Sequence, residues 1–275
     1  MSEKSDIVQQ EAKEHSFDLT GQVIMISGVS GQIGQMLVST VLARGGKVLG
    51  IDISIVEIEK VIDLKKWDLN CIHMVEGNIS LKSDVIKAFE EGVDRFGKIT
   101  SQINNAGVSV FAPWTERTDE DFDWVMGVNL KGTFNCMQLF MQYCIDTKTK
   151  GAIVNVASHY GLISPDPRIY TDCARRSPEV YGATKAGVIQ MTKYFSVNSL
   201  ADGANMRVNA VAPGGVRNPC DPQGEDFQRL YSERCPMGRL AEIKEIIGPI
   251  LFLLSKEASY INGHTLVIDG GMTAW

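Results

Sequence analysis

Short apolar segments alternate along the chain with longer segments in which apolar residues recur at helical spacing. The short segments lack strict alternation of apolar and polar positions, which is typical of strands buried on both faces of a parallel sheet. The predicted strands are 22–27, 47–52, 71–77, 101–105, 152–158, 206–213 and 265–269. The predicted helices are 32–44, 81–96, 120–145, 178–200 and 242–254. This order predicts an α/β protein with a single-domain Rossmann fold, whose doubly wound parallel sheet of about seven strands spans residues 17–275 after a flexible tail at 1–16.

Composition narrows the classes of function. The 275 residues carry a net charge of −6 without a long run of Lys or Arg, so nucleic acid is not an expected partner. Six cysteines are scattered without a CxxC pair or a His cluster, so we expect free thiols in a reducing cytoplasm and no metal. The polar N-terminus does not resemble a secretory signal, and the longest apolar run, 246–254, is too short to span a bilayer. A cytoplasmic protein without a membrane partner is therefore predicted.

A glycine-rich turn, SGVSGQIG at 27–34, joins the first predicted strand to the first predicted helix. Gly28 permits the tight turn, Gly31 lets the backbone approach a pyrophosphate, and Gly34 allows close packing of the helix. The helix N-terminus then offers free N–H groups and its positive dipole end to the anion. In this context the turn predicts a dinucleotide site, with an ordinary strand-to-helix turn as the alternative.

The second predicted strand ends at Asp52. A carboxylate at this position accepts hydrogen bonds from the adenosine ribose and repels a 2′-phosphate, so NAD is favoured over NADP. Neither Val29 nor Ile53 offers a basic group that would offset this charge. The alternative is an aspartate that caps the turn after the strand.

Further motifs follow in order along the chain. They are NNAG at 104–107, VNLKGTF at 128–134, IVNVAS at 153–158, YGATK at 181–185, RVNAVAPGGV at 207–216 and INGHTLVIDGG at 261–271. With the glycine turn, this set resembles the short-chain dehydrogenase/reductase superfamily over nearly the whole chain. The resemblance implies an NAD(P)-dependent oxidoreductase that acts on CH–OH groups of a small molecule and assembles as a homotetramer or a dimer.

The resemblance also implies which residues form the site. The catalytic set would be Asn129, Ser158, Tyr181 and Lys185. The cofactor-binding set would be Gly28, Ser30, Gly31, Gln32, Ile33, Asp52, Asn78, Ile79, Asn105, Ala106, Gly107, Tyr181, Lys185, Pro213, Gly214 and Val216. Two positions depart from the usual pattern: Gln32 replaces a glycine, and Asn78 replaces an aspartate near the adenine ring. We expect both changes to be mild, because Gly31 is adjacent to Gln32 and Asn78 keeps an acceptor oxygen.

Tyr181 and Lys185 are the expected acid–base pair. They are four residues apart, so both side chains lie on one face of the predicted helix. A free phenol has a pKa of ~10, and a nearby ammonium favours its ionised form. Ser158, at the end of a predicted strand, can hydrogen-bond the substrate oxygen, while Asn129, by resemblance, holds a water that relays protons through Lys185. A surface Tyr/Lys pair is the alternative.

The segment between Ser158 and Tyr181 is longer than in the shorter members of the superfamily, and its prolines favour a structured loop. Because the loop begins and ends at expected catalytic residues, we expect it to border the substrate pocket. Arginine forks suit phosphate or carboxylate, so its arginines could contact an anionic substrate; alternatively, they face solvent or pair with nearby carboxylates. These arginines are Arg168, Arg175 and Arg176.

This insert, the SGxxGxxG turn and the ending VIDGGMTAW resemble the oxidoreductases of bacterial flagellin modification and nonulosonic-acid biosynthesis. That resemblance implies a sugar-derived substrate, with His159 either at a sugar hydroxyl or packed in a loop. A polyol or gluconate-type dehydrogenase is the close alternative. A 3-oxoacyl thioester reductase normally uses NADP and is disfavoured by Asp52, while the complete catalytic set disfavours an inactive nucleotide-binding regulator. The Pro- and Gly-containing segment 217–235 is expected to move as a lid.

Overall fold

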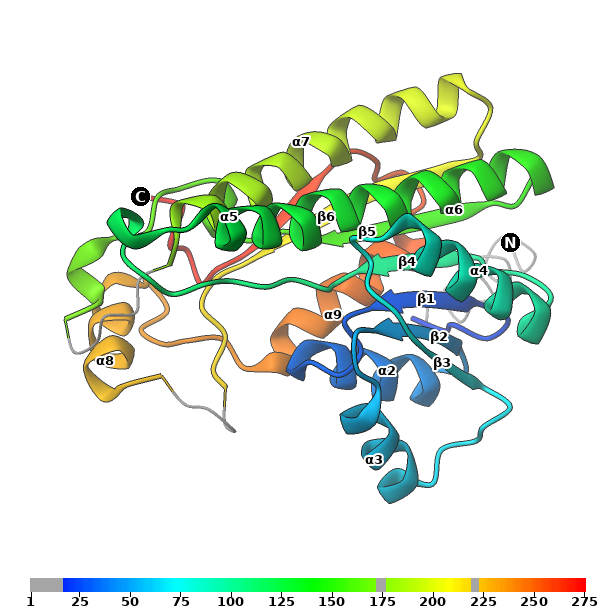
Figure 1. Cartoon of the computed structure of the whole chain (residues 1–275), viewed down its shortest axis with the longest axis horizontal. Coiled ribbons are helices and arrows are strands. Elements are labelled where there is room, and N and C mark those ends of the chain that lie inside the picture. The colour runs from blue at the N-terminus through cyan, green and yellow to red at the C-terminus, as the bar shows by residue number, and fades with distance from the viewer. Residues whose placement is uncertain (1–16, 172–176, 219–222) are drawn as a thin grey trace, which may run out of the picture.

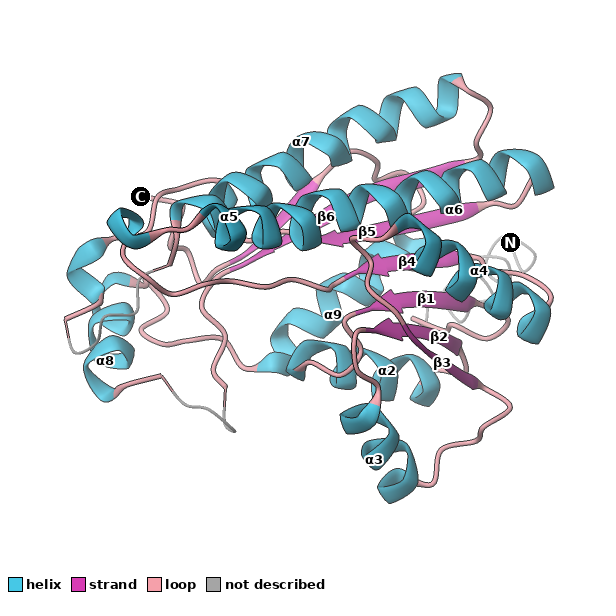
Figure 2. Cartoon of the chain, in the orientation of Figure 1, coloured by secondary structure: helices cyan, strands magenta, loops and turns pink. Residues whose placement is uncertain are grey.

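The computed structural model describes residues 17–171, 177–218 and 223–275, which form a seven-stranded sheet between two layers of helices (Figures 1 and 2). All paired strands are parallel, in the order β3-β2-β1-β4-β5-β6-β7. The predicted single-domain Rossmann fold is confirmed. The strands are β1 (Val23–Ser27), β2 (Lys47–Asp52), β3 (Ile72–Glu76), β4 (Ser101–Asn104), β5 (Gly151–Val156), β6 (Met206–Pro213) and β7 (Thr265–Ile268).

Helices cover both faces of the sheet. One layer contains α2 (Gln32–Ala43), α3 (Val56–Lys65) and α9 (Ile243–Leu254). The opposite layer contains α4 (Lys82–Phe96), α5 (Asp119–Met126), α6 (Thr133–Thr147) and α7 (Glu179–Ala201). Helix α8 (Glu225–Arg234) lies apart from both layers, near the carboxyl ends of the strands (Figure 1). No helix of the described residues is long and apolar enough to cross a membrane.

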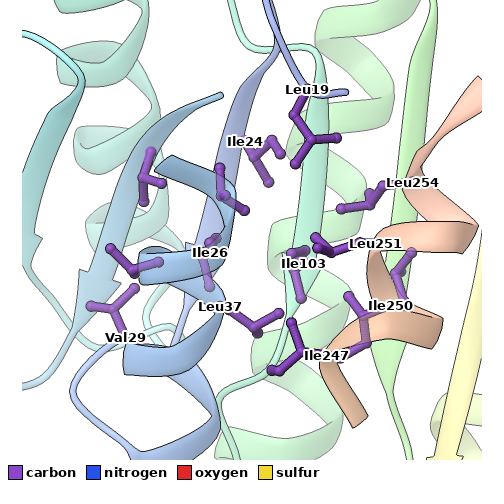
Figure 3. Packing of buried hydrophobic residues seen from close by; sticks show 14 of the residues in the cluster. Leu19, Ile24, Ile26, Val29, Leu37, Ile103, Ile247, Ile250, Leu251 and Leu254 are labelled. Carbon is purple, nitrogen blue, oxygen red and sulfur yellow. The ribbon is translucent and has the colours of Figure 1, made fainter. Parts of the chain in front are cut away.

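Alternate side chains of the buried strands enter two different cores. Ile24 and Ile26 of β1 pack with Leu37 of α2 and Ile250 of α9 (Figure 3). The intervening Val23 and Met25 face the other layer, where they join a cluster that includes Phe140 of α6. Full burial of one such side chain is worth about 1.5–3 kcal/mol. Burial on both faces explains why these strands show continuous apolar runs.

The helices differ from the prediction in two ways. The predicted helix 120–145 is interrupted by a π-helical segment, Gly127–Gly132, which separates α5 from α6. Helices α3 and α8 were not predicted, because many of their residues are charged and contact water rather than a core. Helix α8 occupies most of the segment expected to be a lid, and the described part of the insert includes a short 3₁₀ turn, Pro167–Ile169.

Candidate active site

The turn between β1 and α2 borders a cavity of about 450 Å³ at the carboxyl ends of the strands. At Gly28, φ is +73° and a Cβ would lie 2.7 Å from the Ala106 Cα, so only glycine fits comfortably. A Cβ on Gly34 would overlap the Gly28 carbonyl oxygen. Asn105 supports the same turn, since its Nδ2 donates to the carbonyl oxygens of Ser27 and Gly28 at 3.2 and 3.0 Å.

The residues of this cavity fit a dinucleotide. Gly31 is the N-cap of α2, and no side chain caps the N–H groups of the first turn. These N–H groups can therefore bind an anion. The nearest atom to a Cβ on Gly31 is 3.6 Å away, which leaves the backbone approachable. Asp52 borders the cavity at the end of β2, where its Oδ2 accepts a hydrogen bond from the Ser30 N–H at 2.9 Å. Ser30 is held in turn, because its Oγ donates to the Ser54 carbonyl oxygen at 2.6 Å.

Most of the predicted cofactor residues line this cavity. They are Gly28, Ser30, Gly31, Gln32, Ile33, Asp52, Asn78, Ile79, Asn105, Ala106, Gly107 and Val216. Tyr181 and Gly214 line a neighbouring cavity instead, while Pro213 and Lys185 are buried and line neither cavity. The prediction missed Ile51, Ile53, Gly77, Val108, Trp124 and Val128, which also line the cofactor cavity. Ile51, Ile53 and Gly77 adjoin predicted residues, so chain proximity could have identified them.

The expected catalytic set converges beside this cavity. Lys185 is only 4% exposed, and its Nζ donates to the Val156 carbonyl oxygen at 2.8 Å and lies 5.5 Å from the centre of the Tyr181 ring. Asn129 lies in the π-helical segment, where its Oδ1 accepts from the Val108 N–H at 2.8 Å and its Nδ2 donates to the Val108 carbonyl oxygen at 3.0 Å. A Cβ on Gly107 would lie 3.3 Å from the Lys185 Nζ and 3.5 Å from the Asn129 Oδ1. The irregular helix therefore places Asn129 next to Lys185.

Burial changes the acid–base properties that the Tyr181/Lys185 spacing suggested. Desolvation raises the pKa of Tyr181, and a hydrogen bond with Ser158 opposes this only in part. Desolvation also lowers the pKa of Lys185 to about 8. The Tyr181/Lys185 spacing predicted a lowered pKa for Tyr181, whereas its burial in the folded chain raises the pKa.

A second cavity of about 340 Å³ adjoins the first and shares Gly107, Val108 and Val216 with it. Ser158, two residues after β5, and Tyr181 of α7 both line it, which makes it the candidate substrate pocket. Its remaining lining comes from several distant segments, namely Ser109, Phe111, His159, Tyr160, Tyr170, Ser177, Gly214, Gly215, Gln223, Phe227 and Tyr231. The insert borders the pocket as expected, through Tyr170 and Ser177.

The predicted substrate residues do not all reach this pocket. His159 lines it and is 2% exposed, with its Nδ1 2.9 Å from the Pro213 carbonyl oxygen. Arg168 does not: its side chain is 79% exposed and pairs with Asp166 at 2.7 Å, beside Arg234 on the outer surface. Of the two alternatives for Arg168, the structure shows the ion pair with a nearby carboxylate and not a contact with the substrate pocket. Arg175 and Arg176 lie outside the described residues.

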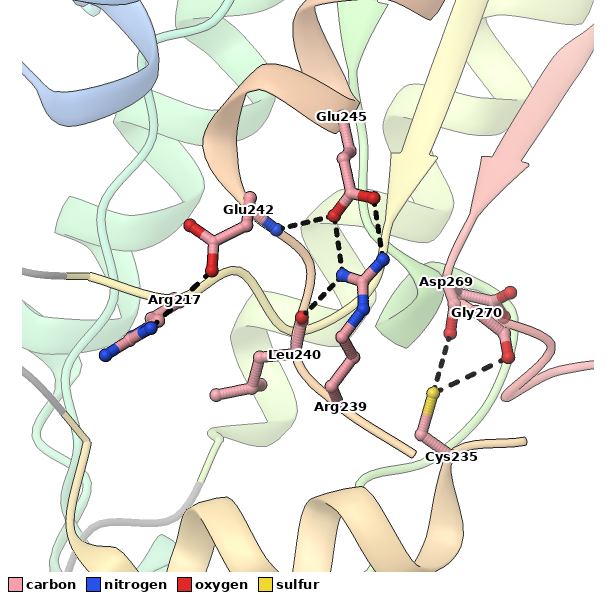
Figure 4. A network of polar contacts seen from close by, with 8 residues as sticks. All are labelled: Arg217, Cys235, Arg239, Leu240, Glu242, Glu245, Asp269 and Gly270. Carbon is pink, nitrogen blue, oxygen red and sulfur yellow. Dashed lines mark hydrogen bonds and ion pairs between the residues drawn. The ribbon is translucent and has the colours of Figure 1, made fainter. Parts of the chain in front are cut away.

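Gln32, the departure from the usual glycine pattern, joins the phosphate turn to the segment after β6. Its Nε2 donates to the Arg217 carbonyl oxygen at 2.7 Å. A polar network connects Arg217 in that segment to the residues at the start of α9 (Figure 4). Arg217 pairs with Glu242 at 3.6 Å, and Glu245 accepts from the Glu242 N–H at 2.8 Å while it pairs with Arg239 at 2.6 Å. The segment that carries Val216 is therefore fixed between both cavities.

Comparison with known proteins agrees with this architecture. Residues 28–273 match the family described as Enoyl-(Acyl carrier protein) reductase. A 3-oxoacyl-(acyl-carrier-protein) reductase FabG of Thermotoga maritima is 34% identical over 92% of this chain and 98% of its own length. A short-chain dehydrogenase of Leptospira borgpetersenii with bound NAD+ is 34% identical, with a TM-score of 0.83 over 93% of this chain and 94% of the other. A gluconate 5-dehydrogenase of Burkholderia cenocepacia with NADP and tartrate is 26% identical, with a TM-score of 0.79 over 94% and 98%. The chain belongs to the short-chain dehydrogenase/reductase superfamily of nicotinamide-dependent oxidoreductases.

Proposed function

We propose that this protein is an NAD-dependent oxidoreductase that transfers a hydride between the nicotinamide and a carbinol or ketone of a sugar-derived substrate. The observation that carries the proposal is the position of Ser158 and Tyr181. Both line a pocket that opens into the dinucleotide cavity, and Lys185 and Asn129 lie directly behind them. A substrate in this pocket would have its reacting carbon next to the nicotinamide end of the cofactor.

The chain's own residues supply positioning and proton transfer. A bound nicotinamide would supply the hydride chemistry. Ser158 would hydrogen-bond the reacting oxygen, and the Tyr181 hydroxyl would donate a proton to it in reduction or accept one in oxidation. A free phenol is protonated at neutral pH, and burial raises the pKa of Tyr181 further, which suits proton donation in reduction. Lys185 and Asn129 act through Tyr181 and are positioning residues.

NAD is the proposed cofactor because Asp52 borders the cavity where the adenosine ribose would lie. The carboxylate would accept hydrogen bonds from the ribose hydroxyls and repel a 2′-phosphate. The bound NAD+ of the Leptospira structure supports this choice, while the NADP of the Burkholderia structure makes the comparison of both cofactors necessary.

The substrate class has two further candidates. The gluconate 5-dehydrogenase supports a polyol or sugar acid, and the Thermotoga reductase supports a 3-oxoacyl thioester. The sugar-derived substrate rests on the resemblance to flagellin-modification and nonulosonic-acid oxidoreductases. A homotetramer or a dimer is the proposed assembly, since α5 and α7 carry exposed apolar side chains.

The first experiment measures NADH formation from NAD+ with polyols, sugars, sugar acids and sugar phosphates, and NAD(P)H consumption with hydroxy ketones and acetoacetyl-CoA. Tyr181→Phe removes the proton-transferring hydroxyl, so we expect kcat to fall by at least roughly 100-fold. Fluorescence titration should show that the variant retains its affinity for NADH. Full activity of Tyr181→Phe, or turnover restricted to NADP(H), would contradict the proposal.

A further inference from the structure

Three residues that line the candidate substrate pocket each carry a buried polar atom without a hydrogen-bond partner in the described part of the chain. These atoms are His159 Nε2, Gln223 Oε1 and Ser109 Oγ, and each is shielded from water by protein atoms. A buried polar group without a partner is costly, so native proteins usually satisfy such atoms with protein, water or ligand. Three such atoms around one pocket indicate that its occupant supplies the missing hydrogen bonds.

The contacts of His159 determine what its free nitrogen can do. The Pro213 carbonyl oxygen can only accept, so the Nδ1 that lies 2.9 Å from it must carry the proton. Burial lowers the pKa of His159, which keeps the ring neutral. The Nε2 of a neutral ring protonated at Nδ1 is an acceptor. The ring next to Ser158 therefore requires a hydrogen-bond donor.

Gln223, which also lines the pocket, likewise has an acceptor atom that requires a hydrogen-bond donor. Its Nε2 donates to the Val216 carbonyl oxygen at 2.9 Å, so Oε1 is the atom of the side-chain amide that has no partner. An amide oxygen only accepts hydrogen bonds, whereas the hydroxyl of Ser109 can donate or accept. At least two of the three atoms thus need donors.

The described lining of the pocket carries no charge that would select an anion. Among the described residues that line it there is no Lys, Arg, Asp or Glu. The hydroxyls of Tyr160 and Tyr170 are hydrogen-bonded to each other at 3.0 Å. Together with Phe227, these two rings form an aromatic part of the pocket lining. The hydroxyl groups of an uncharged substrate are donors that such a pocket can accommodate.

We propose that the substrate is an uncharged polyhydroxylated compound, with a hydroxyl adjacent to the reacting carbinol that donates to His159 Nε2 and a more distant hydroxyl that donates to Gln223 Oε1. His159 is then a specificity-determining residue. This inference rests on the proposed function and narrows it. The 3-oxoacyl group of a thioester has no hydroxyl next to its reacting carbonyl and would leave the acceptor of His159 buried and unpaired.

The test compares substrates that differ by one hydroxyl, using the full-length enzyme with NAD(H). One pair is 2,3-butanediol with 2-butanol in oxidation, and the other is acetoin with 2-butanone in reduction. We expect the hydroxylated member to have a kcat/KM at least roughly 100-fold higher, because sites that hydrogen-bond a substrate hydroxyl discriminate strongly against analogues without it. Polyols of four to six carbons should exceed the butanediol through Gln223.

Two variants separate the acceptor from the structural contact of the ring. In His159→Asn the side-chain amide can still donate to the Pro213 carbonyl oxygen, but no acceptor remains at the Nε2 position. In His159→Gln the amide can place an acceptor near that position. We expect the ratio of kcat/KM between diol and alcohol to fall at least tenfold in His159→Asn and to stay nearer the wild-type ratio in His159→Gln. NADH affinity, measured by fluorescence, reports that each variant is folded.

The outcomes distinguish this inference from the function on which it rests. Equal kcat/KM for diol and alcohol, or the same ratio in the wild type and His159→Asn, would overturn the inference while the oxidoreductase function stands. Preference for acetoacetyl-CoA or for sugar phosphates would also overturn it. If no carbinol or ketone of any panel were turned over although NADH binds, the proposed function and this inference would both fail.

Discussion

Burial of Lys185 couples the candidate active site to the stability of the fold. The side chain is 4% exposed and burial lowers its pKa to about 8, whereas a lysine in the unfolded chain has a pKa of about 10.4. Between these values the unfolded chain binds more protons than the folded chain, so the free energy of unfolding rises with pH. Below pH 8 both states are protonated and the folded chain carries the cost of a buried charge.

Replacement of this side chain should remove that pH dependence. From pH 7 to pH 9 the wild type should gain about 1 kcal/mol of stability relative to Lys185→Met. Urea unfolding at both pH values measures the difference. Lys193→Met, an exposed position on the same helix α7, is the matched control and should not show the gain. An equal gain in both comparisons would show that Lys185 is not the group responsible.

Residue types and chain order were enough to predict most of the cofactor cavity but little of the substrate pocket. The cofactor residues follow the ends of predicted strands, so neighbours in sequence are neighbours in the site. Ser109, Gln223 and Tyr231 come from separate loops and from α8, which only tertiary packing brings together. Spacing also could not show that desolvation dominates the pKa of Tyr181, because burial is a property of the folded chain.

The turn from β1 to α2 has little room for side chains at two of its glycines, Gly28 and Gly34. Gly34 lies against the Gly28 carbonyl oxygen, with the Val29 Cα 2.7 Å from the position of a Cβ, whereas Gly31 has open space on the same turn. Gly34→Ala should lower the free energy of unfolding by about 1–3 kcal/mol or more, since a packed backbone must move to admit the methyl group. Urea unfolding measures this loss.

Gly31→Ala is the matched control for that substitution. It should leave stability nearly unchanged, because its nearest contact is an ordinary 3.6 Å. If Gly31 faces a pyrophosphate, the same variant should weaken NADH binding in a fluorescence titration. Equal destabilisation by both alanines would mean that the close approach of Gly34 does not limit the turn.

At the level of elements, the strands were predicted within one or two residues and two helices were missed. Strands buried on both faces have a strong apolar signal, whereas α3 and α8 expose much of their surface and carry many charges. The break between α5 and α6 could not be predicted, because the π-helical segment has a helical sequence pattern. This segment holds Asn129, a residue of the proposed site, against the Val108 backbone.

For the whole molecule, the layer formed by α5 and α7 presents more apolar surface than the sheet requires. Phe122 on α5 and Tyr194, Val197 and Leu200 on α7 are exposed, although other side chains of the same helices pack inward. Tyr194, Val197 and Leu200 recur at three-residue spacing on the last turns of α7, and exposed apolar side chains that share a helix face often mark sites of association. We therefore expect this layer to be the main contact between subunits of the proposed homotetramer or dimer.

A charge placed in this layer tests the expected assembly. Val197 is 67% exposed, so Val197→Glu is tolerated in a monomer but would leave an unpaired charge in a subunit interface. Light scattering after size-exclusion chromatography should show that the wild type is an oligomer and that the variant dissociates to a smaller species at the same concentration. Leu64→Glu, at an 83% exposed position on α3, should retain the wild-type mass, because α3 lies in the opposite layer. A monomeric wild type, or an unchanged mass for Val197→Glu, would show that the apolar surface of α7 does not hold the assembly together.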